Sequence, residues 1–163
     1  MKLRVLAKRS MTFERTIAAP AGEVFAIVAD IANTARWLPG SAMFGGVRDV
    51  TPDPVCLGTT FVDYGRLGKR YGSVIDFVRD SCIAFHQPMD FKAPVPGRVE
   101  VRVRYTFEPL DSGTRVIRHL DAELDIAGPA KLLAPLVFGS IFRENERVMS
   151  ALKKHAESAA ARL

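Results

Sequence analysis

The chain has 163 residues, of which 48% are hydrophobic and 25% charged, and its formal net charge is +5. A chain of this size and composition can bury a core as a single globular domain without disulfides or metals. Its basic residues are scattered among acidic ones, which argues against a nucleic-acid partner, and no apolar stretch reaches the ~20 residues of a membrane span.

The two cysteines, Cys56 and Cys82, form neither a disulfide framework nor a metal-spaced cluster. Reduced thiols are typical of a cytoplasmic protein, and a cytoplasmic location is what we expect. Residues 1–10 are basic but lack the continuous apolar region of a signal peptide. We therefore expect them to form a basic N-terminal tail, either frayed or strand-like, followed by a single domain over residues 11–163.

The N-terminal third predicts one strand and two short helices. Residues 12–18 alternate as a strand does, and Pro20 suits the first position of a helix. An apolar helical stripe follows at the spacing i, i+3, i+4, i+7, formed by Val24, Ile27, Val28 and Ile31. Asn33 or Thr34 can cap a second short helix that carries Trp37 and ends at Pro39-Gly40.

The middle of the sequence has the turn residues and short alternating segments that are typical of a β-sheet. Turn residues separate six further predicted strands, over residues 46–50, 59–64, 71–78, 83–89, 99–109 and 114–125. The clearest alternation runs from Val99 to Phe107, which indicates one buried and one wet face. Gly128-Pro129 then opens a long helix to about Ala160, in which Pro135 predicts a kink or a short break.

Several of these segments resemble the START-like or SRPBCC superfamily. They are Ala-Pro-x-x-x-Val-Phe-x-x-Val-x-Asp at 19–30, Trp37-Leu38-Pro39, Gly58, the Gly-Thr-Arg-Val hairpin at 113–116 and the Gly-Pro entry to the last helix. Within it, the chain is most similar to bacterial proteins described as polyketide cyclase/dehydrase and lipid transport. The resemblance implies an α+β helix-grip (Bet v 1/START-like) fold, a bent antiparallel seven-stranded sheet wrapped on a long C-terminal helix, with two short helices after the first strand.

The same resemblance implies a deep hydrophobic cavity between sheet and helix. Alternation places Arg118 among Val116 and Leu120, so a guanidinium would face the interior, where it needs a partner. It would anchor a carboxylate, phenolate or carbonyl of a ligand, or pair with Glu144 of the last helix. The predicted ligand-binding residues are Trp37, Phe61, Phe77, Phe85, Val101, Val103, Tyr105, Arg118, Leu120, Phe138 and Phe142.

No catalytic motif, metal-ligand spacing or cofactor-binding loop is present, so we predict no metal and no cofactor. The weak candidates for catalysis are Arg118, Tyr64 and Tyr71, which could polarise a carbonyl. Asp63 and Asp76 fit better as outer-face ion-pair partners than as an inward base of raised pKa. Trp37 could gate the cavity or simply pack.

Three functions remain open on this reasoning. The leading one is binding of a hydrophobic small molecule, such as a lipid, polyketide or quinone, by a monomer or weak dimer without stable membrane insertion. The second is a polyketide cyclase/aromatase that catalyses aldol cyclisation and dehydration by shaping its substrate. The third is a protein-interaction module that uses the terminal helix or the basic tail.

Overall fold

The computed structural model of the chain describes residues 4–91 and 97–163. It contains seven strands and four helical segments. In chain order they are β1 (Arg4–Ile17), α1 (Ala21–Ala29), η1 (Ile31–Arg36), β2 (Gly46–Thr51), β3 (Thr60–Gly65), β4 (Gly68–Val78), β5 (Cys82–Phe91), β6 (Gly97–Leu110), β7 (Gly113–Ala127), η2 (Gly128–Leu133) and α2 (Ala134–Ala160).

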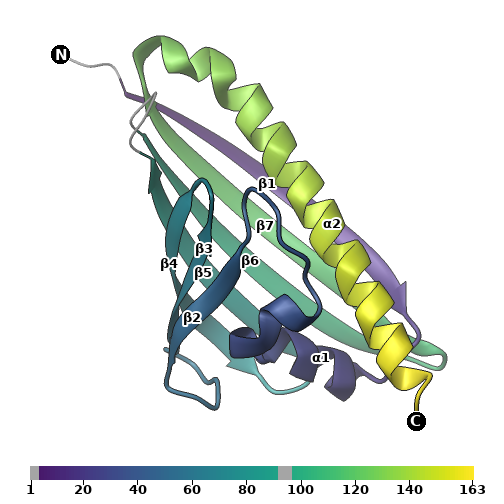
Figure 1. The fold of residues 1–163 in the computed structure, drawn as a ribbon. Coiled ribbons are helices and arrows are strands. Elements are labelled where there is room, and N and C mark those ends of the chain that lie inside the picture. The colour runs from purple at the N-terminus through teal and green to yellow at the C-terminus, as the bar shows by residue number, and fades with distance from the viewer. Residues whose placement is uncertain (1–3, 92–96) are drawn as a thin grey trace.

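The strands form one antiparallel sheet in the order β1-β7-β6-β5-β4-β3-β2. The sheet is strongly bent, α2 lies along its inner face, and α1 and η1 lie at the end where α2 finishes (Figure 1). This is the helix-grip architecture that the resemblance implies. Inward side chains of the strands bury against a single helix rather than a second sheet.

The two short helices form much as the sequence predicts. α1 begins after Pro20 and buries Val24, Phe25 and Val28 of its apolar stripe. The second, η1, is a 3-10 helix that begins at Ile31, earlier than predicted, and Trp37 follows its last residue instead of lying within it. Ile31 belongs to the stripe of α1, and its burial continues that face directly into η1.

The long C-terminal element is broken near Pro135, which is the second of the two predicted outcomes. A 3-10 helix, η2, ends at Leu133, and α2 begins at Ala134 with Pro135 in its first turn. The missing N–H of a proline costs nothing there, because the first turn of a helix has free N–H groups anyway. α2 then buries one stripe against the sheet, which includes Ile141, Met149 and Leu152.

The first strand is longer than predicted. It begins at Arg4, so residues 4–10 are paired with β7, from Arg4 opposite Ala127 to Ser10 opposite Asp121, which fits the strand-like alternative and not a frayed tail. Lys8 forms an ion pair with Glu123 at 3.0 Å, and the guanidinium of Arg9 lies 5.5 Å from the ring centre of Phe138 on α2. Alternation in this segment is weak, which is why the sequence suggested a tail.

Removing residues 1–9 is expected to lower the free energy of unfolding by about 1–3 kcal/mol, since each cross-strand pair lost contributes roughly 0.2–1 kcal/mol. Urea unfolding followed by circular dichroism measures this change. Removal of residues 161–163, which lie beyond the end of α2, is the control and should have little effect. Equal stability of the 1–9 deletion and the full chain would show that the segment contributes nothing to the sheet.

Candidate functional site

A chamber of about 150 Å³ lies between the sheet and α2, and its walls come from α1, η1, six strands and α2. We call it the inner chamber. Apolar side chains make most of its surface, but it also contains a set of polar ones. These polar residues are Thr34, Asp63, Arg70, Gln87, Tyr105, Arg118, Glu144 and Asn145, together with the indole of Trp37.

A second space of about 410 Å³, the outer pocket, adjoins the inner chamber. The two share Met43, Leu67, Met89, Val99 and Ile141 as lining residues. The rest of the outer pocket is formed by η2, the first turns of α2 and the ends of β5 and β7, and Ser140 is the one polar residue among those that line it. The site is therefore amphipathic, with a polar inner part and an apolar outer part.

Arg118 is the central polar residue of the inner chamber. In the sheet register it lies directly between Tyr105 of β6 and Phe13 of β1. Its Nε donates to Asn145 Oδ1 of α2 at 2.7 Å, and its Nη1 donates to the hydroxyl of Tyr105. These contacts fix the guanidinium, and the residue keeps some accessible surface because it faces the chamber.

Among the described residues, no carboxylate forms a direct ion pair with Arg118, although Glu144 and Asp63 stabilise its charge from a greater distance. The predicted alternative, an ion pair with Glu144, is wrong: Glu144 binds Arg147 at 2.6 Å and accepts a hydrogen bond from Ser41. Burial lowers the pKa of Arg118 to about 9, which still leaves the side chain cationic at pH 7. A buried cation bonded only to neutral groups is well suited to bind an anionic or strongly polarised oxygen.

Asp63 also faces the inner chamber, contrary to the prediction that it lies on the outer face. It is only 6% exposed, and its Oδ2 accepts from Arg70 at 2.7 Å and from Gln87 at 3.3 Å. Burial raises the pKa of Asp63, and the Arg70 charge opposes this shift. Asp76, by contrast, is on the outer face as expected and pairs with Arg104 at 2.6 Å.

Most of the predicted ligand-binding residues meet in the inner chamber, since they occupy inward positions of β3, β5, β6 and β7 or follow η1. Those that line it are Trp37, Phe61, Phe85, Val101, Val103, Tyr105, Arg118 and Leu120. Their meeting follows from the two-residue period of the strands, which puts alternate residues on one face.

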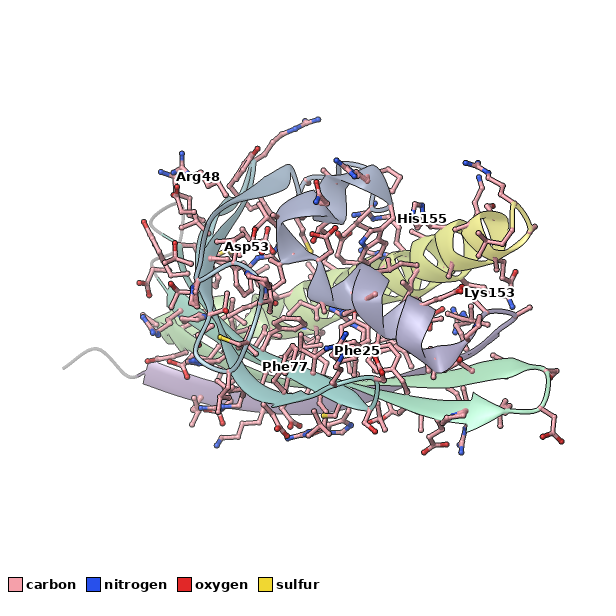
Figure 2. All side chains as sticks on the ribbon, turned by 90° about the horizontal axis from the view of Figure 1, so that it is seen from below. Phe25, Arg48, Asp53, Phe77, Lys153 and His155 are labelled. Carbon is pink, nitrogen blue, oxygen red and sulfur yellow. The ribbon has the colours of Figure 1, made fainter. Side chains whose placement is uncertain are left out.

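The three other predicted residues lie elsewhere. Phe77 packs edge-on against Phe25 of α1, with 5.5 Å between ring centres, and the two point toward each other in Figure 2. Phe138 is buried in the main core beneath Arg9. Phe142 is 48% exposed and rests against Phe13, because it lies on the flank of the α2 stripe rather than on its inward face.

The candidates Tyr64 and Tyr71 are outside the cavity, and neither lines it. They are 39% and 65% exposed. Tyr64 follows inward Asp63 on β3, and Tyr71 precedes inward Gly72 on β4, so both project from the outer face. A role in polarising a ligand carbonyl is therefore not available to either side chain.

From the sequence, Asp63 was placed on the wrong face of its strand, and Arg70, Gln87 and Asn145 were not identified as cavity residues. A signal existed for Asp63, because it lies two residues after Phe61, which was predicted to face inward, and the strand period puts both on one face. Gln87 has the same relation to Phe85. Arg70 could not be found this way, because the predicted β4 began after it, at residue 71.

Within residues 4–91 and 97–163, no group of three or more His, Cys, Asp or Glu side chains is arranged to hold a metal ion. Over the same residues, no helix has the length and apolar character needed to cross a bilayer.

Comparison with known proteins identifies this architecture. The family model described as polyketide cyclase/dehydrase and lipid transport matches residues 8–157. No curated protein sequence matches the chain.

Among solved structures, a START superfamily protein from Mycobacterium smegmatis is 18% identical, with a TM-score of 0.63 and coverage of 93% of this chain and 98% of that one. The di-domain aromatase/cyclase BexL of the BE-7585A biosynthetic pathway is 19% identical, with a TM-score of 0.68. The match covers 92% of this chain and 50% of BexL, so this chain spans about half of that protein. Ara h 8.0201 is 13% identical, with a TM-score of 0.65 and coverage of 93% and 99%. At these identities the likeness shows the fold.

Proposed function

This chain belongs to the polyketide cyclase/dehydrase and lipid transport family, and we propose that it binds one amphiphilic small molecule, polar end inward, in the cavity between the sheet and α2. The anionic or carbonyl oxygen of the ligand binds Arg118 in the inner chamber. The apolar part of the ligand extends into the outer pocket.

The observation that carries this proposal is the unpaired charge of Arg118 in a largely apolar cavity. Burying a guanidinium without a carboxylate in direct contact is costly, and the neutral partners and the more distant carboxylates of Glu144 and Asp63 offset only part of that cost. A ligand oxygen in the chamber would supply the missing partner. Ligand binding would therefore offset the cost of burying the Arg118 guanidinium.

The two adjoining spaces, which share five lining residues, also suit a ligand with two different ends. The inner chamber alone, at about 150 Å³, has room for a group of roughly the size of a benzene ring. The outer pocket adds about 410 Å³ of almost wholly apolar lining. Each methylene that enters it contributes up to ~0.8 kcal/mol before ordering costs.

Trp37 provides a direct assay, because it is the only tryptophan of the chain and lines the inner chamber. Titration with dodecanoate is expected to change its emission saturably at one molecule per chain, and dodecanol to bind more weakly because it lacks the charge. Octanoate should bind more weakly than dodecanoate because it buries less apolar surface. N-acetyltryptophanamide controls for direct quenching. A linear, unsaturable response identical to that of the control compound would contradict the proposal.

A second candidate function is catalysis of proton transfer on a polyketide-like ligand, as in a cyclase. It is favoured by Asp63, an inward carboxyl group whose pKa burial raises, in the same chamber as Arg118. Such a group can act as a base, and a fixed cation can stabilise the enolate that forms. Mass spectrometry coupled to chromatography of the ligand recovered after incubation distinguishes the two functions. Loss of water indicates cyclisation with dehydration, an unchanged mass at a new retention time indicates cyclisation alone, and an unchanged mass at an unchanged retention time indicates binding alone.

A further inference from the structure

Two polar atoms of the inner chamber have no hydrogen-bond partner among the described residues. Asp63 Oδ1 and Trp37 Nε1 are both buried, and neither has a hydrogen-bond partner in the part of the chain that the structure describes. Both residues line the chamber. Since the great majority of buried polar atoms in native proteins are hydrogen-bonded, two unpaired ones in the same ligand-sized cavity point to groups on the ligand.

The two atoms require opposite hydrogen-bond partners, a donor for the carboxylate oxygen and an acceptor for the indole N–H. Asp63 is held by Arg70 and Gln87 through Oδ2 alone, so its position is fixed while Oδ1 stays free to accept. An indole N–H only donates, so Trp37 requires an oxygen acceptor. A simple carboxylate offers acceptors but no donor, and an alkyl chain offers neither. A hydroxyl group supplies the donor that Asp63 lacks.

We propose that Asp63 and Trp37 form a second recognition point in the inner chamber and that the preferred ligand is a hydroxylated amphiphilic acid. Its hydroxyl donates to Asp63 Oδ1, and one of its oxygens accepts from Trp37 Nε1–H. This inference rests on the proposed function, in which Arg118 binds the acid group. A site built to hydrogen-bond a substrate hydroxyl discriminates strongly against the analogue that lacks it, because its own buried groups are then left unpaired.

The test compares dodecanoate with its hydroxylated forms, the 2-, 3- and 4-hydroxydodecanoates, by isothermal titration calorimetry on the wild-type chain. We expect at least one hydroxy acid to bind roughly tenfold or more tightly than dodecanoate, the range for a hydrogen bond to a charged group. The comparison requires no substitution, so it stands whether or not any variant folds.

A double variant assigns the preference to Asp63. Asp63→Leu with Arg70→Met removes both members of the buried pair, so no unpaired charge of that pair is left behind. The matched control is Asp76→Leu with Arg104→Met, which removes an ion pair of the same kind from the outer face of the sheet. We expect the first variant to bind dodecanoate and the hydroxy acid equally, and the control to keep the preference.

The outcomes separate this inference from the proposed function. If dodecanoate binds and all the hydroxy acids bind no more tightly, the second recognition point is wrong while the proposed function stands. If none of the acids binds the wild-type chain, both are wrong. A preference for a hydroxy acid that survives in the Asp63→Leu/Arg70→Met variant would also overturn the assignment to Asp63.

Discussion

Replacement of Arg118 by methionine is expected to weaken binding of dodecanoate by at least about thirtyfold. Removing one partner of a buried, hydrogen-bonded charge pair costs roughly 2–5 kcal/mol, and 2 kcal/mol corresponds to that factor. Binding of dodecanol should change far less, because it carries no charge. Calorimetric titration of both ligands measures the difference.

The same variant should remain folded. At pH 7 the buried guanidinium is charged, and because burial lowers its pKa to about 9, the folded state bears a desolvation cost that the unfolded chain does not. That cost falls only as the pH rises above about 9, so at neutral pH methionine removes it. Loss of the bonds to Asn145 and Tyr105 offsets the gain, and we expect the free energy of unfolding to change by less than about 2 kcal/mol.

Arg102→Met is the matched control for this prediction. Arg102 lies on β6, is exposed and is 3.9 Å from Glu100, so the control removes an equal charge from the outer face of the sheet. It should bind dodecanoate as the wild-type chain does. Equal affinity of the Arg118→Met and Arg102→Met variants for dodecanoate would show that Arg118 does not hold the acid group.

Filling the inner chamber should abolish binding altogether. Val101 lines the chamber from β6 and is only half-buried, so the larger side chain of Val101→Phe can extend into the open space. We expect no measurable binding of dodecanoate or of the hydroxy acids. Substitutions that fill a cavity commonly stabilise a protein by about 0.5–2 kcal/mol, and a gain within that range is expected here.

Val78→Phe is the corresponding control, because Val78 is 53% exposed at the outer face of β4. It introduces the same side chain into the same sheet without entering the cavity. Thermal unfolding and dodecanoate titration of both variants complete the comparison. Retained binding in Val101→Phe, with a stability no lower than that of the control, would place the ligand somewhere other than the inner chamber.

The strand alternation of this chain predicts most of the cavity wall. Arg118 is placed inward by its neighbours Val116 and Leu120, and Tyr105 by Val103 and Phe107, and both face the cavity as expected. Alternation succeeds in β6 and β7 because these strands pair without interruption over their whole length. The helix-grip fold itself was implied by the resemblance to the START-like superfamily, and alternation indicated which strand residues face the cavity.

Alternation fails where local irregularities change it or where a strand begins in an unexpected place. The register of β4 against β5 shifts between Val74 and Asp76, so inward positions before and after the shift are not in phase. The partner of Arg118 was also unpredictable, since Glu144 and Asn145 are adjacent on α2 and only the helix rotation decides which one meets the guanidinium. The rotation of α2 is set by the packing of its whole apolar stripe against the sheet, and no local sequence pattern indicates it.

The most direct test of the proposed binding site is native mass spectrometry of the wild-type chain and of Val101→Phe after incubation with dodecanoate. We expect one bound molecule per wild-type chain, lost on denaturation, and none on Val101→Phe. No adduct on the wild-type chain, or the same adduct on both, would contradict the claim that the cavity beneath α2 is the binding site.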